Sequence, residues 1–169
     1  MAPELPRRLY TADGVRSLDA SAIADHGIPG AVLMERAGAS VLRALRARWP
    51  DTRRLAIVAG TGNNGGDGFV VARLAAASGL AARVVLVGEP ARSRGDAGEM
   101  LARMEAVGIQ AERFGPAGLA GADVVVDALL GTGISRAPRG EHAGAIEAMN
   151  DAPAPTVAID RPSGLSADT

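Results

Sequence analysis

Short apolar runs that end in a turn of polar or glycine residues alternate with helix-like segments, and this alternation restricts the fold more than any other feature. The runs are continuously apolar, as in strands that are covered on both faces. They lie at 54–60 (RLAIVAG), 82–88 (ARVVLVG), 123–130 (DVVVDALL) and 156–160 (TVAID). The segments between them predict helices at 66–78, 94–107 and 141–150, and a short strand at 110–114. Alternation of this kind predicts right-handed crossovers and a parallel sheet.

Two further helices are expected before the first apolar run, at 12–25 and 31–48. Thr11 can cap the first helix, and the Pro29–Gly30 pair separates the two. One face of the first helix is apolar and carries Val15, Leu18, Ala22 and Ile23. We therefore expect an α/β fold, a three-layer α/β/α Rossmann-like sandwich with a mostly parallel sheet, preceded by two N-terminal helices.

Composition excludes several classes of protein. The 169 residues fit one domain, and the absence of cysteine removes disulfide scaffolds, thiolate metal sites and cysteine nucleophiles. All 18 cationic side chains are arginine, so no lysine can act as a base or form a Schiff base. The net charge of −1 gives no indication of nucleic-acid binding. No apolar stretch approaches the ~18 residues of a membrane span, and the N-terminus does not resemble a signal peptide, so we expect a cytoplasmic protein.

Three polar loops leave the carboxyl ends of the expected strands, at 60–67, 127–135 and 160–163. In open α/β sheets, ligands bind in the crevice at these ends. The loops are therefore expected to converge on one site.

The first loop, GTGNNGGDG at 60–68, satisfies the nucleotide-binding pattern G-x-G-x-x-G between a strand and a helix. Glycines allow positive φ and close backbone approach, and a helix N-terminus offers free N–H groups to an anion. A purely structural glycine turn is the alternative. Asn63, Asn64 and Asp67 add two amides and a carboxylate, and the second strand lacks the acidic residue that usually binds ribose. The loop is thus better suited to polar recognition of more than phosphate.

The loop sequence resembles the hallmark of the YjeF N-terminal domain family, whose members are NAD(P)H-hydrate epimerases. Further family blocks follow in the same order: Leu33–Gly38 (LMERAG) in the preceding helix, Asp127–Gly133 (DALLGTG) with Arg136 and Gly140, and Asp160–Leu165 (DRPSGL). The likeness covers about residues 9–169. It implies a single YjeF N-terminal-like domain at 1–169, ended before the usual C-terminal strand and its lysine.

The resemblance implies repair of NADH and NADPH that have been hydrated on the nicotinamide ring, by interconversion of their R and S forms. A partner dehydratase, fused to the domain in some relatives, would then restore the cofactor, and a homodimer through residues 12–48 is expected. The substrate-site residues that it implies are Asn63, Asn64, Gly65, Gly66, Asp67, Gly131, Thr132, Gly133, Ile134, Ser135, Arg136, Ala137 and Asp160. It also implies a potassium ion held by Asn64, Asp127 and Ser163, which supply the oxygen ligands that a hard cation prefers.

Asp160 is the catalytic candidate. The hydrate is a hemiaminal, so the ring nitrogen can expel the neighbouring hydroxyl, and Asp160 would protonate that hydroxyl and deprotonate the returning water. The alternative for Asp160 is a turn residue or an ion pair with Arg161, which stands where the family has an aliphatic residue. Asp127 could instead be a helix or turn cap.

Other polar residues carry weaker signals. We expect His26 and His142 to be ordinary surface histidines, while Arg136 and Arg139 either meet substrate phosphates or lie in a solvated loop.

Two other functions remain open from the sequence. One is a non-catalytic nucleotide-binding or dimerising module of the same fold. The other is an ordinary NAD-dependent oxidoreductase, which lacks a clear ribose-binding acid and a well-placed hydride-transfer partner here. An intact set of site residues favours the epimerase.

Overall fold

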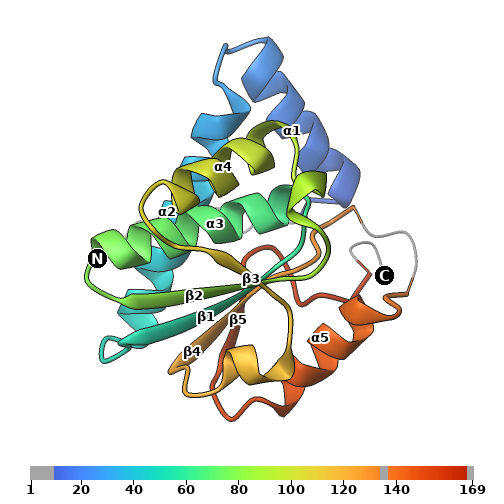
Figure 1. The fold of residues 1–169 in the computed structure, drawn as a ribbon. Coiled ribbons are helices and arrows are strands. Elements are labelled where there is room, and N and C mark those ends of the chain that lie inside the picture. Colours follow the sequence, from blue (N-terminus) through green and yellow to red (C-terminus); the bar gives the residue numbers. More distant parts are fainter. Residues whose placement is uncertain (1–9, 134–136, 167–169) are drawn as a thin grey trace.

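A parallel five-stranded sheet forms the centre of the computed structural model, which describes residues 10–133 and 137–166. The strands are β1 (Arg54–Ala59), β2 (Ala81–Leu86), β3 (Ala111–Arg113), β4 (Val124–Ala128) and β5 (Thr156–Ala158). Their order is β3-β2-β1-β4-β5, and every pair is parallel (Figure 1). The chain proceeds from β1 to β2 on one side and later returns to β4 on the other. A sheet of this kind opens a crevice at the carboxyl ends of the two strands where the order reverses.

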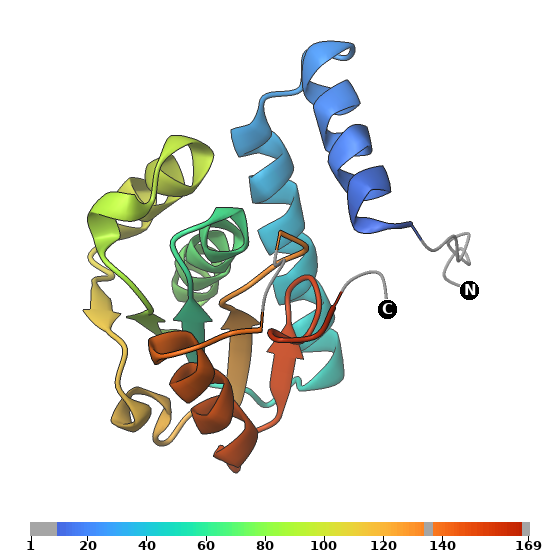
Figure 2. The same cartoon turned by 90° about the vertical axis from the view of Figure 1, so that its right-hand side faces the viewer.

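Helices cover both faces of this sheet (Figure 2). One layer holds α2 (Gly30–Arg48), α3 (Asn63–Ala77) and α4 (Gly95–Glu105), which pack on one another. The other face carries α5 (Glu141–Asp151) and the short 3-10 helix η2 (Pro116–Leu119). The expected three-layer α/β/α architecture is confirmed, with the difference that α2 belongs to a layer instead of merely preceding it. Neither η2 nor a second 3-10 helix, η1 (Pro90–Arg92), was expected from the sequence.

The core divides between the two faces because successive strand residues point to opposite sides. Leu55 and Ile57 of β1 pack under α2, α3 and α4, whereas Ala56 and Val58 pack toward α5. All four are at most 2% exposed. Because both faces of the strands are buried, their sequences are continuously apolar. The packed sheet supports the loops at its carboxyl edge.

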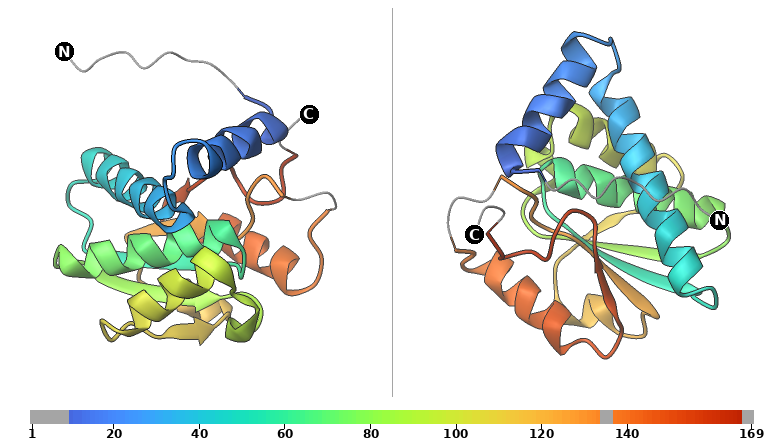
Figure 3. Two further views of the ribbon diagram at one scale, coloured as in Figure 1. Left: turned by 90° about the horizontal axis from the view of Figure 1, so that it is seen from above. Right: turned by 180° about the vertical axis from the view of Figure 1, so that it is seen from behind.

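The first helix, α1 (Ala12–Ala24), lies outside the sandwich. Thr11 caps it by accepting a 3.1 Å hydrogen bond from the Gly14 amide, as its sequence predicts. Figure 3 shows α1 and α2 diverging from their connection like the arms of a V, with α1 away from the sheet. Leu18 and Ile23 are 53% and 46% exposed, so none of the described residues covers this part of its apolar face. No helix in the described parts of the chain is long and apolar enough to span a membrane.

Candidate functional site

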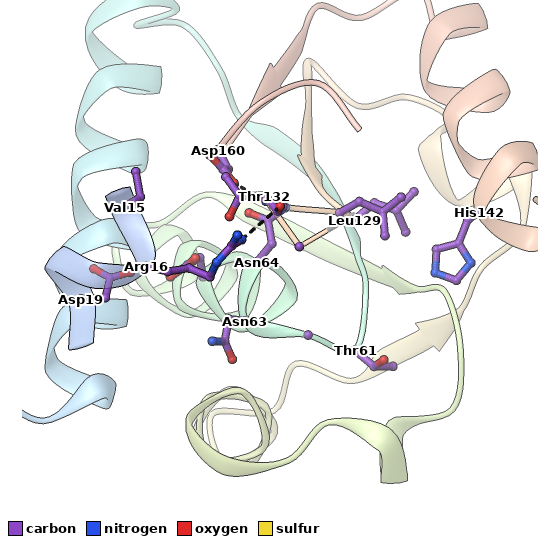
Figure 4. A pocket seen from close by; sticks show the side chains of 15 residues that line it. Val15, Arg16, Asp19, Thr61, Asn63, Asn64, Leu129, Thr132, His142 and Asp160 are labelled. Carbon is purple, nitrogen blue, oxygen red and sulfur yellow. Dashed lines mark hydrogen bonds between the residues drawn. The ribbon is translucent and has the colours of Figure 1, made fainter. Parts of the chain in front are cut away.

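A cleft of about 540 Å³ opens at the carboxyl ends of β1 and β4. Its walls come from the segment after β1, the segment after β4, Asp160 beyond β5, and α1. Figure 4 shows Asp160, Thr132 and Asn64 near its middle, with Arg16 and Asp19 on one side and Leu129 and His142 on the other. The crevice predicted from the three polar loops is therefore present.

Helix α3 begins at Asn63, three residues before the predicted start, so the glycine-rich motif forms its first turn rather than a free loop. Among the described glycines with positive φ, none belongs to this motif. The need for glycine is one of space. A Cβ on Gly65 would lie 1.8 Å from the carbonyl oxygen of Gly60, and one on Gly60 would lie 2.2 Å from that of Leu129. The expected close approach is thus made to the protein's own backbone.

The polar side chains of this turn line the cleft, whereas Gly65 and Gly66 do not. Asn63 and Asp67 line the cleft, and Asn64 lines it with only 9% of its surface exposed. The Asn64 Nδ2 atom is buried and has no hydrogen-bond partner among the described residues. Gly65 and Gly66 are not among the lining residues: they are buried in packing, and a Cβ on Gly66 would lie 2.5 Å from the Met34 sulfur.

The segment after β4 holds Asp160 in place. The Thr132 backbone N–H donates a 2.9 Å hydrogen bond to Asp160 Oδ2, and a Cβ on Gly131 would lie 3.1 Å from the same oxygen. Arg161 donates from Nη2 to the Gly131 carbonyl at 3.2 Å, and no ion pair joins it to Asp160 in the described chain. Of the alternatives considered for Asp160, the ion pair with Arg161 is thereby excluded.

The remaining predicted residues of this segment are Ile134, Ser135, Arg136 and Ala137, of which the structure describes only Ala137. Ile134, Ser135 and Arg136 lie outside the described residues. Ala137 and Arg139 are exposed and do not line the cleft, so Arg139 matches the solvated-loop alternative.

Asp127 and Ser163, which are 36 positions apart, form a buried pair beneath the cleft. Ser163 donates to the Asp127 carboxylate twice, from its backbone N–H and from its hydroxyl, each at 2.7 Å. The Leu129 N–H donates to the same carboxylate at 3.1 Å, and Ser163 Oγ also accepts from the Leu130 N–H at 2.9 Å. Asp127 therefore ties the turn after β4 to the segment after β5, and it is 3% exposed.

Asp127, Ser163 and Asn64 carry oxygen atoms, which are the ligands that a hard cation prefers. Asp127 takes part in none of the ion pairs between described residues, so its buried negative charge is met only by neutral donors. The unpartnered amide end of Asn64 is a further unsatisfied group, and an amide can present its oxygen after a flip of the side chain. Oxygen ligands of this kind fit potassium. No cluster of three or more His, Cys, Asp or Glu side chains that could hold a metal occurs in the described residues.

Asp67 is the side chain of the cleft with the most perturbed protonation. Burial first, and then the charges of Asp160 and Asp19, together raise its pKa from the ordinary 3.8 to about 7. No hydrogen bond or ion pair to its carboxyl group is formed within the described residues. A carboxyl group in this state can hold or release a proton near neutral pH.

Several lining residues were missed from the sequence. Helix α1 contributes Val15, Arg16 and Asp19, and Arg16 donates from Nη1 to the Thr132 carbonyl at 3.4 Å while forming an ion pair with Asp13. Nothing in the spacing of α1 indicates that its polar face meets a loop more than 100 residues away. His142, expected as an ordinary surface histidine, lines the cleft from the first turn of α5.

Comparisons with known proteins found a matching family, similar proteins and a solved structure of similar fold. The family described as YjeF-related protein N-terminus matches residues 30–169. The NAD(P)H-hydrate epimerase of Pirellula staleyi is 41% identical over 171 residues, covering 96% of this chain and 75% of that protein. The bifunctional NAD(P)H-hydrate repair enzyme of Pyrobaculum aerophilum is 45% identical over 150 residues, covering 85% of this chain but only 30% of that protein. The crystal structure of yeast ynu0 is similar in fold, with a TM-score of 0.84 at 22% identity over 93% of this chain and 71% of that one.

Proposed function

Because the chain belongs to the family of the YjeF-related protein N-terminus, we propose that it is an isomerase that interconverts the R and S hydrates of NADH and NADPH. The observation that carries this proposal is the position of Asp160. Its carboxyl group is held by the Thr132 amide at the middle of a cleft whose walls are the two glycine-rich segments of the family. A carboxyl group fixed in an open cleft, and not used in an ion pair, is free to exchange protons with a bound molecule.

Asp160 would act as general acid and base. In the hydrate, a hydroxyl group sits on the carbon next to the ring nitrogen. The nitrogen lone pair forms a C=N bond as the C–O bond breaks, and a proton from the carboxyl group converts the departing hydroxyl into water. Water then adds to the same carbon and returns a proton to the carboxylate. The negative charge of the site also stabilises the transient cation.

Binding of the nucleotide would use the first turn of α3. Its N-cap residue, Gly62, has no side chain to satisfy the free N–H groups at this helix end, so they are available to an anion. Arg16 adds a positive charge at the other side of the cleft. Asn63 and Thr132 would offer polar contacts between these two points.

A potassium ion held by Asn64, Asp127 and Ser163 is part of the proposal. What supports it is the buried Asp127 carboxylate without a cationic partner in the described chain and the unpartnered amide of Asn64. Bound there, the ion would supply a fixed positive charge next to the buried Asp127 carboxylate.

The test is an epimerisation assay on purified S and R hydrates, with potassium present or replaced by tetramethylammonium. We expect acceleration by the wild-type protein, a lower rate without potassium, and a loss of at least about 100-fold in Asp160→Asn with unchanged circular dichroism. No acceleration in either salt would instead support the alternative, a non-catalytic nucleotide-binding module. Full activity of Asp160→Asn would refute the assignment of Asp160.

We also propose a homodimer through α1 and α2, and functional coupling to a dehydratase, as the name of the bifunctional relative suggests. Support for the dimer comes from the exposed apolar side chains of α1, Leu18 and Ile23 among them. Light scattering should give twice the 17.1 kDa chain mass for the wild type and the monomer mass for Leu18→Asp. Val107→Asp, at a similarly exposed apolar position beyond α4, is the control and should stay dimeric. A wild-type monomer would rule the dimer out.

A further inference from the structure

Epimerisation asks for proton transfer on both faces of the nicotinamide ring. The hydroxyl leaves from one face, and the other epimer forms only when water adds to the opposite face. A single carboxyl group can serve both events only if it reaches both sides of the ring or if the bound intermediate turns over. This inference rests on the proposed function and concerns how the cleft solves that problem.

The cleft holds a second carboxyl group, Asp67, in an environment unlike that of Asp160. Asp160 is exposed and accepts a 2.9 Å hydrogen bond from the Thr132 amide. Asp67 is half-buried on the first part of α3, and its carboxyl group accepts no hydrogen bond from a described residue. Environments that differ in this way separate the protonation states of paired carboxyl groups, as general acid–base sites require.

The two carboxyl groups also belong to different walls. The backbone of Asp67 packs against α2, because a Cβ on Gly38 of that helix would approach the Asp67 backbone carbonyl oxygen to 3.1 Å. Asp67 borders both the main cleft and a smaller cavity of about 180 Å³ that extends to Met34 on α2. Asp160 enters from the segment after β5, where its Oδ2 would lie 3.1 Å from a Cβ on Gly131. Figure 4 shows it near Thr132 at the middle of the cleft. A ring bound between them would present one face to each.

The groups that surround Asp67 favour its protonated form. Burial, Asp160 and Asp19 together raise its pKa to about 7. Arg16 on α1, paired with Asp13, and His142 on α5 are the basic groups that line the cleft in the described chain, and Asp96 on α4 borders the smaller cavity. With Asp160 and Asp19 as charged neighbours, Asp67 keeps its proton more readily, which places a proton donor in the same cleft as the Asp160 carboxylate.

We propose that Asp67 and Asp160 form a two-carboxyl acid–base pair in which each serves one face of the hydrated ring. Neutral Asp67 donates its proton to the hydroxyl on its face, the C–O bond breaks, and the ring nitrogen lone pair forms the C=N bond. A water molecule on the other face attacks the same carbon, the C=N electrons return to nitrogen, and the Asp160 carboxylate takes the proton that the water loses. After this step Asp67 is ionised and Asp160 carries the proton. The reverse epimerisation starts from that state, with Asp160 as the acid and Asp67 as the base.

The test uses oxygen-18 water, because it separates loss of the hydroxyl from inversion. Exchange of the substrate hydroxyl and epimerisation are followed together, by mass spectrometry and chromatography, for each purified hydrate after subtraction of the uncatalysed rates. The proteins compared are the wild type, Asp67→Asn, Asp67→Ala as a second variant, and Asp160→Asn. Asp96→Asn is the matched control, since Asp96 borders only the smaller cavity.

We expect inversion to fall by about 100-fold or more in the variants of Asp67 and of Asp160, and to be unchanged in Asp96→Asn. Each single variant should still exchange the hydroxyl of one epimer, and the two positions should retain exchange in opposite epimers. Inversion at the wild-type rate in both Asp67 variants would overturn the pair and leave the proposed function standing. If the Asp67 variants lose hydroxyl exchange in both epimers, Asp67 acts in substrate binding alone. That result would also overturn the acid–base pair. A wild-type protein without acceleration would refute the epimerase function itself, and the pair with it.

Discussion

Replacement of Asp67 by asparagine should stabilise the fold above neutral pH and leave its stability unchanged in mild acid. In the unfolded chain this carboxyl group loses its proton near pH 4, whereas in the folded chain its pKa is raised to about 7, first by burial and then by Asp160 and Asp19. The stabilisation that belongs to the neutral group is therefore complete below about pH 4 and is lost as the pH rises to about 7. Asparagine has a similar shape and never ionises, so the variant avoids this loss.

The size of the effect follows from the shift. About three pKa units at about 1.4 kcal/mol per unit correspond to about 4 kcal/mol. Water in the cleft screens part of this cost because the side chain is only half-buried. We expect Asp67→Asn to exceed the wild type by about 2–4 kcal/mol in free energy of unfolding at pH 8.

Urea unfolding, followed by circular dichroism between about pH 4 and pH 8 in potassium-free buffer, measures this difference. Subtracting the two proteins at each pH cancels the titration of all other groups. The difference should be near zero at pH 4 and grow until about pH 7. A difference that is independent of pH, or a wild type that is the more stable protein at pH 8, would refute the reasoning.

Asp123 offers a control of opposite sign. The Arg54 guanidinium and the backbone N–H groups of Arg53 and Arg54 donate to it and lower its pKa to about 2. Its stabilising contribution is present above about pH 4 and is lost as the pH falls through about 2. Asp123→Asn should therefore be less stable than the wild type by an amount that does not change between about pH 5 and pH 8.

Two further predictions concern packing around the site. Gly65→Ala should cost about 3 kcal/mol or more, because its Cβ would lie 1.8 Å from the Gly60 carbonyl oxygen, whereas Gly62→Ala, with nothing within 4 Å, should cost less than about 1 kcal/mol; equal thermal denaturation curves for the two would contradict this account of the motif. Ser163→Ala should cost about 1–3 kcal/mol in urea unfolding, because buried Asp127 would lose a hydroxyl donor at 2.7 Å, and a variant as stable as the wild type would show that this contact does not support the loops.

Much of the fold could be predicted because its signals are local. A strand covered on both faces must be apolar at every position, so the stretches around β1, β2 and β4 were visible in the sequence, and their ends were accurate to within about two residues. The start of α3 was misplaced for an equally physical reason. Glycines usually indicate a loop, but Gly65, Gly66 and Gly68 lie within α3. They are glycines because the Gly60 carbonyl oxygen and the side chains of Met34 and Ala128 leave no room for a Cβ.

The sequence by itself determined the parallel sheet, the three segments at its carboxyl edge and the polar residues that they carry, because chain direction and strand ends fix which segments share an edge. Only the tertiary structure decided the burial, the contacts and the neighbouring charges of those residues. It brought Arg16 and Asp19 of α1 to the cleft, buried Asp127 against Ser163, and left the Asp67 carboxyl half-buried near two other carboxylates. Burial and through-space charge depend on elements distant in sequence. The spacing of the motif therefore predicts neither the raised pKa of Asp67 nor its position near Asp160.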